Sequence, residues 1–221
     1  MESIISIKNV SVRRDLSGSH KEILSNINFE FDRSILVVQG PSGAGKTSLI
    51  RLINGLSSPS KGHISVLGKP IQDWIPQGLR QKVGYVCQQA IALTDTARGD
   101  LNLSCELAGV DYDATWVKAG FRALGLSDSM LQQSVAQFSV GERQRFSLLR
   151  ALCAKPKILL LDEPSSALDE ARANDVHTFL LNLMEEGLRL VLIEHRPSLL
   201  DLYPKDRIQT LRLENGRRVS T

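Results

Sequence analysis

The fold is decided by eight consecutive residues, Gly40-Pro41-Ser42-Gly43-Ala44-Gly45-Lys46-Thr47. They fit the pattern of a phosphate-binding loop, in which a glycine and four further residues precede Gly-Lys-Thr. Glycines let the backbone curl so that successive N–H groups point at one phosphate chain. The Lys46 ammonium is expected to reach the β- and γ-phosphates, and the Thr47 hydroxyl to bind Mg²⁺. The stretch therefore predicts a nucleotide-binding site.

The segments on either side of this loop predict a strand before it and a helix after it, as a phosphate-binding loop requires. Residues 34–38 form an apolar run typical of a buried strand, and residues 48–53 have the pattern of a helix. The helix N-terminus would point at the phosphates, so Ser48 joins the loop residues as an expected nucleotide-binding residue. A glycine-rich turn without a ligand is the alternative, and the flanking strand and helix argue against it.

Length and composition are those of an ordinary globular chain. The 221 residues fit one domain, and 42% hydrophobic and 23% charged residues are typical of a soluble protein. The net charge of +3 is too small to indicate a nucleic-acid partner. No apolar run approaches the roughly 20 residues that span a bilayer, and the start lacks the features of a signal peptide. Cys87, Cys105 and Cys153 show no metal-binding spacing, which favours buried thiols in a reducing cytosol.

Two segments near the start alternate apolar and polar residues and predict strands at 4–12 and 23–31. The first has an irregularity near Asn9, and the polar segment 13–21 between them holds Ser17-Gly18-Ser19, which predicts a turn. Together with the strand before the phosphate loop, these strands are expected to form an antiparallel flap beside the nucleotide site.

The rest of the chain divides into a helical region and a strand-rich region. Residues 157–161 and 189–193 each contain four consecutive apolar residues after a basic one, and runs apolar on both faces are what central strands of a parallel sheet need. Apolar residues at helical spacings fill the region before them, and further elements are predicted at 63–67, 83–87, 170–186 and 210–218. The predicted fold class is α/β, a single domain over 1–221: a P-loop nucleoside triphosphatase core (1–88 and 155–221), an antiparallel β flap and an inserted α-helical subdomain (89–154).

Two carboxylates end the apolar strand at 157–161. Side chains at the carboxyl end of a parallel strand meet the ligand crevice. Asp162 would hold Mg²⁺ through its water shell, and Glu163 would orient or deprotonate a water near the γ-phosphate. Solvated acids at a strand end are the alternative interpretation.

The segment Phe138-Ser139-Val140-Gly141-Glu142 opens a predicted helix. The Ser139 hydroxyl, the Gly141 N–H and the helix dipole would form a second anion site. By itself, the segment is equally well an ordinary helix start in which Ser139 and Glu142 form a capping box.

Taken in chain order, six landmarks resemble those of the nucleotide-binding subunit of an ATP-binding cassette (ABC) ATPase. They are the phosphate loop, Gln88, Phe138–Glu142, Asp162-Glu163-Pro164, Ser165-Ser166-Ala167-Leu168-Asp169 and His195. The resemblance covers essentially the whole chain. It implies a head-to-tail dimer that encloses two ATP with Mg²⁺, each site combining the phosphate loop of one copy with Ser139 and Gly141 of the other.

The resemblance also implies a role for each matching residue. Gln88 would contact Mg²⁺ and the attacking water, and would sense a membrane partner. Glu163 would be the general base, and His195 would hold the γ-phosphate and the base in register. Asp169 would cross the dimer interface.

Three departures from the family pattern stand out. The usual Leu-Ser-Gly-Gly-Gln signature is replaced at Phe138, Val140 and Glu142, while Ser139 and Gly141 are kept. The aromatic residue that usually stacks on adenine is absent. Since a guanidinium can stack flat on a base, Arg13 or Arg14 is expected to replace it, unless both are solvated charges. Finally, Arg196 follows His195 where the family often has an acid.

The resemblance implies ATP hydrolysis coupled to transport through a separate integral membrane permease, with this chain at the cytoplasmic face of the inner membrane. Stretches such as 166–170 resemble the bacterial iron-efflux type, which implies metal export. A soluble ABC ATPase of the iron–sulfur assembly type is the main alternative. A P-loop kinase acting on a small molecule is another, and it requires neither the Phe138–Glu142 segment nor a dimer.

Overall fold

The structure, a computed structural model, describes residues 3–16, 19–86 and 91–219. Its strands are β1 (Ile5–Leu16), β2 (Ser19–Phe31), β3 (Ile35–Gln39), β4 (Lys61–Val66), β5 (Lys69–Pro70), β6 (Val83–Val86), β7 (Ile158–Asp162), β8 (Arg189–Ile193), β9 (Ile208–Glu214) and β10 (Arg217–Val219). Its α-helices are α1 (Lys46–Ile53), α2 (Pro76–Lys82), α3 (Ala97–Ala108), α4 (Ala114–Ala123), α5 (Val140–Cys153), α6 (Glu170–Glu185) and α7 (Pro197–Leu200).

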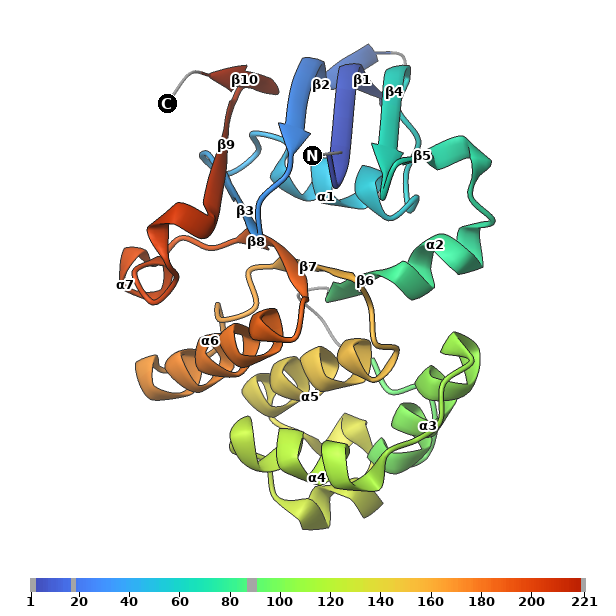
Figure 1. The fold of residues 1–221 in the computed structure, drawn as a ribbon, viewed down its shortest axis with the longest axis vertical. Coiled ribbons are helices and arrows are strands. Elements are labelled where there is room, and N and C mark those ends of the chain that lie inside the picture. Colours follow the sequence, from blue (N-terminus) through green and yellow to red (C-terminus); the bar gives the residue numbers. More distant parts are fainter. Residues whose placement is uncertain (1–2, 17–18, 87–90, 220–221) are drawn as a thin grey trace.

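A six-stranded sheet in the order β10-β9-β3-β8-β7-β6 runs through the middle of the molecule (Figure 1). Its strands are parallel except for β10, which pairs antiparallel with β9. The two apolar runs predicted as central parallel strands are neighbours, β7 and β8. The sheet therefore brings the carboxyl ends of β3, β7 and β8 to one edge, where α/β proteins bind ligands.

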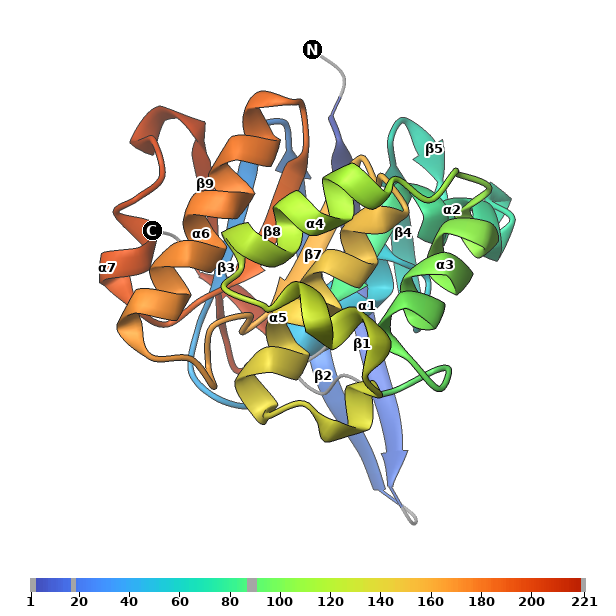
Figure 2. The same ribbon diagram turned by 90° about the horizontal axis from the view of Figure 1, so that it is seen from below.

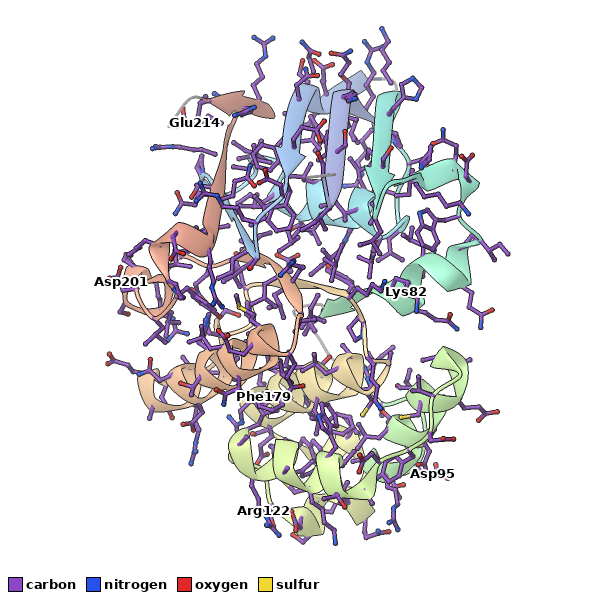
Figure 3. The ribbon with its side chains drawn as sticks, in the orientation of Figure 1. Lys82, Asp95, Arg122, Phe179, Asp201 and Glu214 are labelled. Carbon is purple, nitrogen blue, oxygen red and sulfur yellow. The ribbon has the colours of Figure 1, made fainter. Side chains whose placement is uncertain are left out.

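Successive residues of these strands belong to two different hydrophobic cores, because strand side chains alternate between faces. Leu36 and Val38 pack with α1 and the flap, whereas Ile35 and Val37 pack with α5 and α6. Burial on both faces explains why the central strands are apolar throughout. Side chains fill the space between the ribbons on both sides of the sheet (Figure 3).

The antiparallel flap is a separate four-stranded sheet in the order β2-β1-β4-β5. The prediction that the strand before the phosphate loop belongs to it was wrong, since β3 lies in the six-stranded sheet and β4 completes the flap. The expected irregularity is confirmed: Asn9 has a φ of 53°, and the register with β2 shifts between Ile7 and Val10.

The two long flap strands extend further than the sequence predicted. β1 continues to Leu16 and β2 begins at Ser19, so the described residues of the polar segment 13–21 are paired strand. Ser17 and Gly18 of the predicted turn lie outside the described residues. Their far ends project from the body of the protein as a ribbon (Figure 2). Because Arg13, Arg14, Lys21 and Glu22 are exposed on this ribbon, no apolar alternation marks it as a strand.

Helices α3, α4 and α5 form the helical region that the sequence predicted between β6 and β7, and its described residues include no strand. The division of the chain at 88/89 and 154/155 remains a prediction. Cys105 and Cys153 are buried free thiols, as expected, and burial raises the pKa of both; Cys87 lies outside the described residues. Among the helices of the described part of the chain, none combines the length and apolar character that a bilayer-spanning segment needs.

Candidate active site

The phosphate loop connects β3 to α1 at the carboxyl edge of the six-stranded sheet. Gly40 and Gly45 have φ values of 145° and 98°, which residues with a side chain rarely adopt. A Cβ atom on Gly40 would lie 2.1 Å from the Leu213 carbonyl oxygen. The Lys46 Nζ donates to the carbonyl oxygens of Gly40, at 2.7 Å, and Pro41, at 3.0 Å. This side chain is buried, so its charge is held inside the loop.

The loop forms one wall of a cavity of about 830 Å³. This volume is within the roughly 300–1,000 Å³ typical of small-molecule sites. The lining residues come from the loop, from β2, from the ends of β7 and β8 and from the β9–β10 turn: Lys21, Glu22, Ile23, Gly40, Pro41, Ser42, Gly43, Gly45, Lys46, Thr47, Ser48, Glu163, His195, Asn215 and Gly216. The structure thus brings together the loop and two of the three residues predicted to be catalytic.

The residues predicted to hold Mg²⁺ meet at the start of α1. The Thr47 hydroxyl donates to Asp162 Oδ1 at 3.3 Å, and the Tyr85 hydroxyl lies 3.4 Å from Asp162 Oδ2. Asp162 is buried at the end of β7. One carboxylate and one hydroxyl beside a phosphate site suit Mg²⁺, which keeps several waters and takes its other ligands from substrate phosphates. Gln88, the third predicted ligand, lies outside the described residues.

Glu163 and His195 contact each other at the edge of the cavity. His195 Nε2 lies 3.2 Å from Glu163 Oε1, although the two residues are 32 positions apart. Glu163 has a φ of 54°. A left-handed conformation costs a residue with a side chain about 1–3 kcal/mol, and such strain gathers at functional sites. The Glu163 N–H donates to the Ile193 carbonyl oxygen at 3.1 Å, which ties β7 to β8 at this edge.

The second predicted anion site lies elsewhere on the chain. The capping box is present: the Ser139 N–H donates to Glu142 Oε2 at 2.8 Å, and the Glu142 N–H donates to Ser139 Oγ at 3.3 Å. Hydrogen bonds from the side chain and backbone of Ser139 lower the pKa of Glu142. Asp169 caps α6, accepting from the Arg172 N–H at 2.8 Å. Among the described residues lining the cavity, none belongs to 139–141 or is Asp169.

The arginines predicted to stack on adenine are exposed on β1 and are not among the described lining residues of the cavity. Arg13 pairs with Glu22 and Arg14 with Lys21 across the β1–β2 ladder. Since both β2 partners line the cavity, the two arginines lie one strand away from it. Their role in base binding remains a prediction.

Changing Arg13 and Arg14 together to Ala is expected to weaken ATP binding by about 1 kcal/mol, the scale of an exposed cation on a ring. Because stacking reads no base edge, GTP and ATP should bind about equally well to the parent. Calorimetric titration with both nucleotides measures this, with Lys21→Ala as the comparison variant. Parent-like ATP affinity in the double variant, with a loss in Lys21→Ala, would instead place the base against β2.

Sequence reasoning missed several residues around the site. Gln144 of α5 donates to the Glu163 carbonyl oxygen at 2.9 Å and accepts from the Ala167 N–H at 3.3 Å. Asn215 and Gly216 lie within the element predicted at 210–218, and they line the cavity. Gln144 belongs to no motif that would single it out in the sequence, and it is buried in α5 together with Arg145 and Ser147.

Comparisons with known proteins agree with this geometry. The family model described as "ABC transporter" matches residues 24–166. "Probable iron export ATP-binding protein FetA" of Escherichia coli (strain K12) is 31% identical over 215 residues, covering 96% of this chain and 93% of that protein. "Taurine import ATP-binding protein TauB" of Pseudomonas putida is 37% identical over 182 residues, covering 80% of this chain and 68% of that protein.

Solved structures share the fold. An ATP-binding cassette solved as a dimer in a post-hydrolysis state with ADP and Pi has a TM-score of 0.83 at 22% identity, covering 97% of this chain and 96% of that one. A bacterial Atm1-family ABC exporter with ATP bound also has a TM-score of 0.83, at 27% identity, covering 99% of this chain and 38% of that one. The chain belongs to the ABC transporter family, as one of its ATP-hydrolysing cassettes.

Proposed function

We propose that two copies of this chain enclose two ATP molecules and that hydrolysis drives a separate membrane permease at the cytoplasmic face of the inner membrane. The contact of 3.2 Å between His195 Nε2 and Glu163 Oε1, in the cavity that also holds Lys46, carries this proposal. This contact supports a role for Glu163 as the general base and for His195 as a hydrogen-bonding partner of the γ-phosphate. The match to the ABC transporter family model excludes the alternative of a P-loop kinase acting on a small molecule.

The phosphate loop would bind the triphosphate through its backbone N–H groups and Lys46. Its ammonium would exchange the carbonyl oxygens of Gly40 and Pro41 for phosphate oxygens. Thr47 and Asp162 would hold Mg²⁺, which, when bound, neutralises charge on the β- and γ-phosphates.

Glu163 would take a proton from the attacking water, and it lines the cavity immediately after the end of β7. His195 Nε2 would hold the γ-phosphate while keeping Glu163 in register. Both side chains are partly exposed, His195 to 53% and Glu163 to 30%, so water reaches the reacting position. Gln88 is assigned to Mg²⁺ and the attacking water by family resemblance.

A second copy would complete the site. Ser139 and Asp169 are exposed at the N-terminal ends of α5 and α6, away from the cavity of their own chain. Helix N-termini favour anions, so the Ser139 end of α5 is suited to face the γ-phosphate bound by a partner copy, and Asp169 would lie at the interface between the two copies. The dimeric form of the similar cassette with ADP and Pi supports this arrangement.

A groove of about 670 Å³ between α2, α3 and α5 is the proposed contact with the permease. Ile75 and Leu107 beside it are exposed to 76% and 57%, and exposed apolar side chains grouped on a surface mark interaction sites. Gln77 and Gln81 of α2 donate to the Leu107 carbonyl oxygen, which fixes the two walls of the groove to each other. The transport reaction that we propose for the complex is metal export, which is supported by the name of the FetA relative.

Tagged protein isolated from membranes of cells that make it is expected to bring an integral membrane protein with it, identified by mass spectrometry. Leu107→Asp, which adds charge to the groove, should release that partner while leaving ATP hydrolysis by the purified chain at the parent level. Recovery of the chain from the soluble fraction, active and without a membrane protein, would favour the iron–sulfur assembly type of ABC ATPase.

A further inference from the structure

Glu194, between the end of β8 and His195, is a buried carboxylate with both oxygens occupied. Oε1 accepts from the backbone N–H groups of His195, at 2.8 Å, and Arg196, at 2.9 Å. Oε2 accepts from the Ser165 hydroxyl and lies 3.5 Å from His177 Nε2. Ser165 and His177 are completely buried, and Glu194 is 6% exposed.

This carboxylate remains charged despite its burial. Burial by itself raises the pKa of Glu194, but contacts from His177, Ser165 and the two backbone N–H groups outweigh it and lower the pKa to about 2. The hydrogen bonds to a buried charge are among the stronger ones in a protein. Glu194 is therefore expected to accept these hydrogen bonds as a carboxylate near neutral pH.

Arg196, which follows His195 in the chain, also contacts the segment 165–168. Its Nη2 donates to the Ser165 carbonyl oxygen and lies 3.4 Å from the Leu168 carbonyl oxygen. Ser165 comes two residues after Glu163. The residues on either side of His195 are thus both bonded to the segment that follows Glu163.

The cluster is also anchored to α6. His177 Nδ1 lies 2.8 Å from the Tyr203 hydroxyl, and the two rings pack edge to face with centroids 5.6 Å apart. Tyr203 is buried, at 2% exposure. Glu194 therefore connects the His195 loop to a rigid helix as well as to the Glu163 segment.

We propose that Glu194 and Arg196 are positioning residues that clamp the loop carrying His195 onto the segment carrying Glu163. This rests on the roles proposed above for those two residues. The His195–Glu163 contact joins side chains that are 53% and 30% exposed, so packing alone does not hold it. Glu194 and Arg196 supply that restraint through bonds to the backbone. Arg196, which stands where the family often has an acid, thus helps to hold the His195 loop against the Ser165 segment.

Glu194→Ala is expected to lower kcat for ATP about tenfold to a hundredfold, the effect of displacing a catalytic pair by about an ångström. The KM for ATP should change less than about threefold, because no phosphate-loop contact is lost. Glu194→Gln should restore most of kcat, since its amide oxygen can still accept from both backbone N–H groups and its NH₂ can donate to the Ser165 hydroxyl oxygen. Ser147→Ala is the matched control: it removes a buried hydroxyl of α5 that lies outside this cluster, and kcat should stay near the parent value.

A double-mutant cycle with His195→Ala separates positioning from general structural damage. If Glu194 acts through His195, Glu194→Ala should cost little further kcat in a His195→Ala background. Independent, multiplying losses would overturn the clamp, as would parent-like kcat in Glu194→Ala alone. Parent-like kcat in His195→Ala would instead overturn the proposed role of His195. If thermal unfolding shows that Glu194→Ala does not fold, Arg196→Ala takes its place in the same cycle, because it leaves the buried carboxylate bonded, and the same outcomes decide.

Discussion

Replacing Glu163 with Gln is expected to lower the rate of ATP hydrolysis about 10²–10⁴-fold, the range found when a general base is lost. The amide keeps the size and the hydrogen bond to His195, which is 3.2 Å away in the parent protein, so ATP binding should survive. Steady-state phosphate release and nucleotide titration measure the two effects separately. Glu106→Gln on the exposed side of α3 is the matched control and should hydrolyse ATP at the parent rate. Parent-rate hydrolysis by Glu163→Gln would falsify the base assignment.

The same variant should change the assembly state. With hydrolysis blocked, two ATP would stay between the copies, and Glu163→Gln should elute as a dimer in size-exclusion chromatography with ATP and Mg²⁺. Adding Ser139→Arg should abolish this dimer, because Ser139 lies exposed at the start of α5 and the longer side chain would occupy the partner's γ-phosphate position. A dimer that persists with Ser139→Arg would contradict the shared site.

Lys46→Ala should lower ATP affinity about tenfold to a hundredfold. A hydrogen bond to a charged group contributes roughly 1.5–3 kcal/mol, which corresponds to that range in the dissociation constant. The Lys46 ammonium is buried within the loop, where it donates to the carbonyl oxygens of Gly40 and Pro41, so the substitution removes the cation held at the phosphate position. Titration calorimetry measures the loss.

Lys118→Ala is the control for Lys46→Ala, because it removes the same charge from an exposed site on α4. Its ATP affinity should equal that of the parent. Equal affinity in Lys46→Ala as well would remove the phosphate-loop assignment.

Local patterns were enough to predict most elements of the core. Residues 158–161 of β7 and 190–193 of β8 are all apolar because both faces of these strands are buried, and that signal needs no knowledge of the partner strand. The flap was harder, since membership of a sheet depends on pairing between distant segments. β3 was therefore assigned to the wrong sheet, and β4 was not recognised as a flap strand. The helix α2 was missed because only Leu79 in it is buried, which leaves no apolar periodicity.

Within the candidate site, too, residues in local motifs were predicted from the sequence, whereas a residue whose partners are distant in the chain was not. Lys46, Thr47, Asp162 and Glu163 lie within short motifs whose chemistry fixes their spacing, so the sequence located them. Glu194 has no such motif, because its partners Ser165 and His177 come from other elements of the fold.

The left-handed backbone of Glu163 lowers the stability of the fold at the same position that is proposed to carry the catalytic base. Glycine adopts such a φ at almost no cost, so a chain optimised for resistance to heat alone would carry glycine there. Under the proposed base role, such a protein would unfold at a higher temperature but hydrolyse ATP far more slowly. The left-handed conformation of Glu163 is therefore a local cost in stability at the position that bears the proposed base.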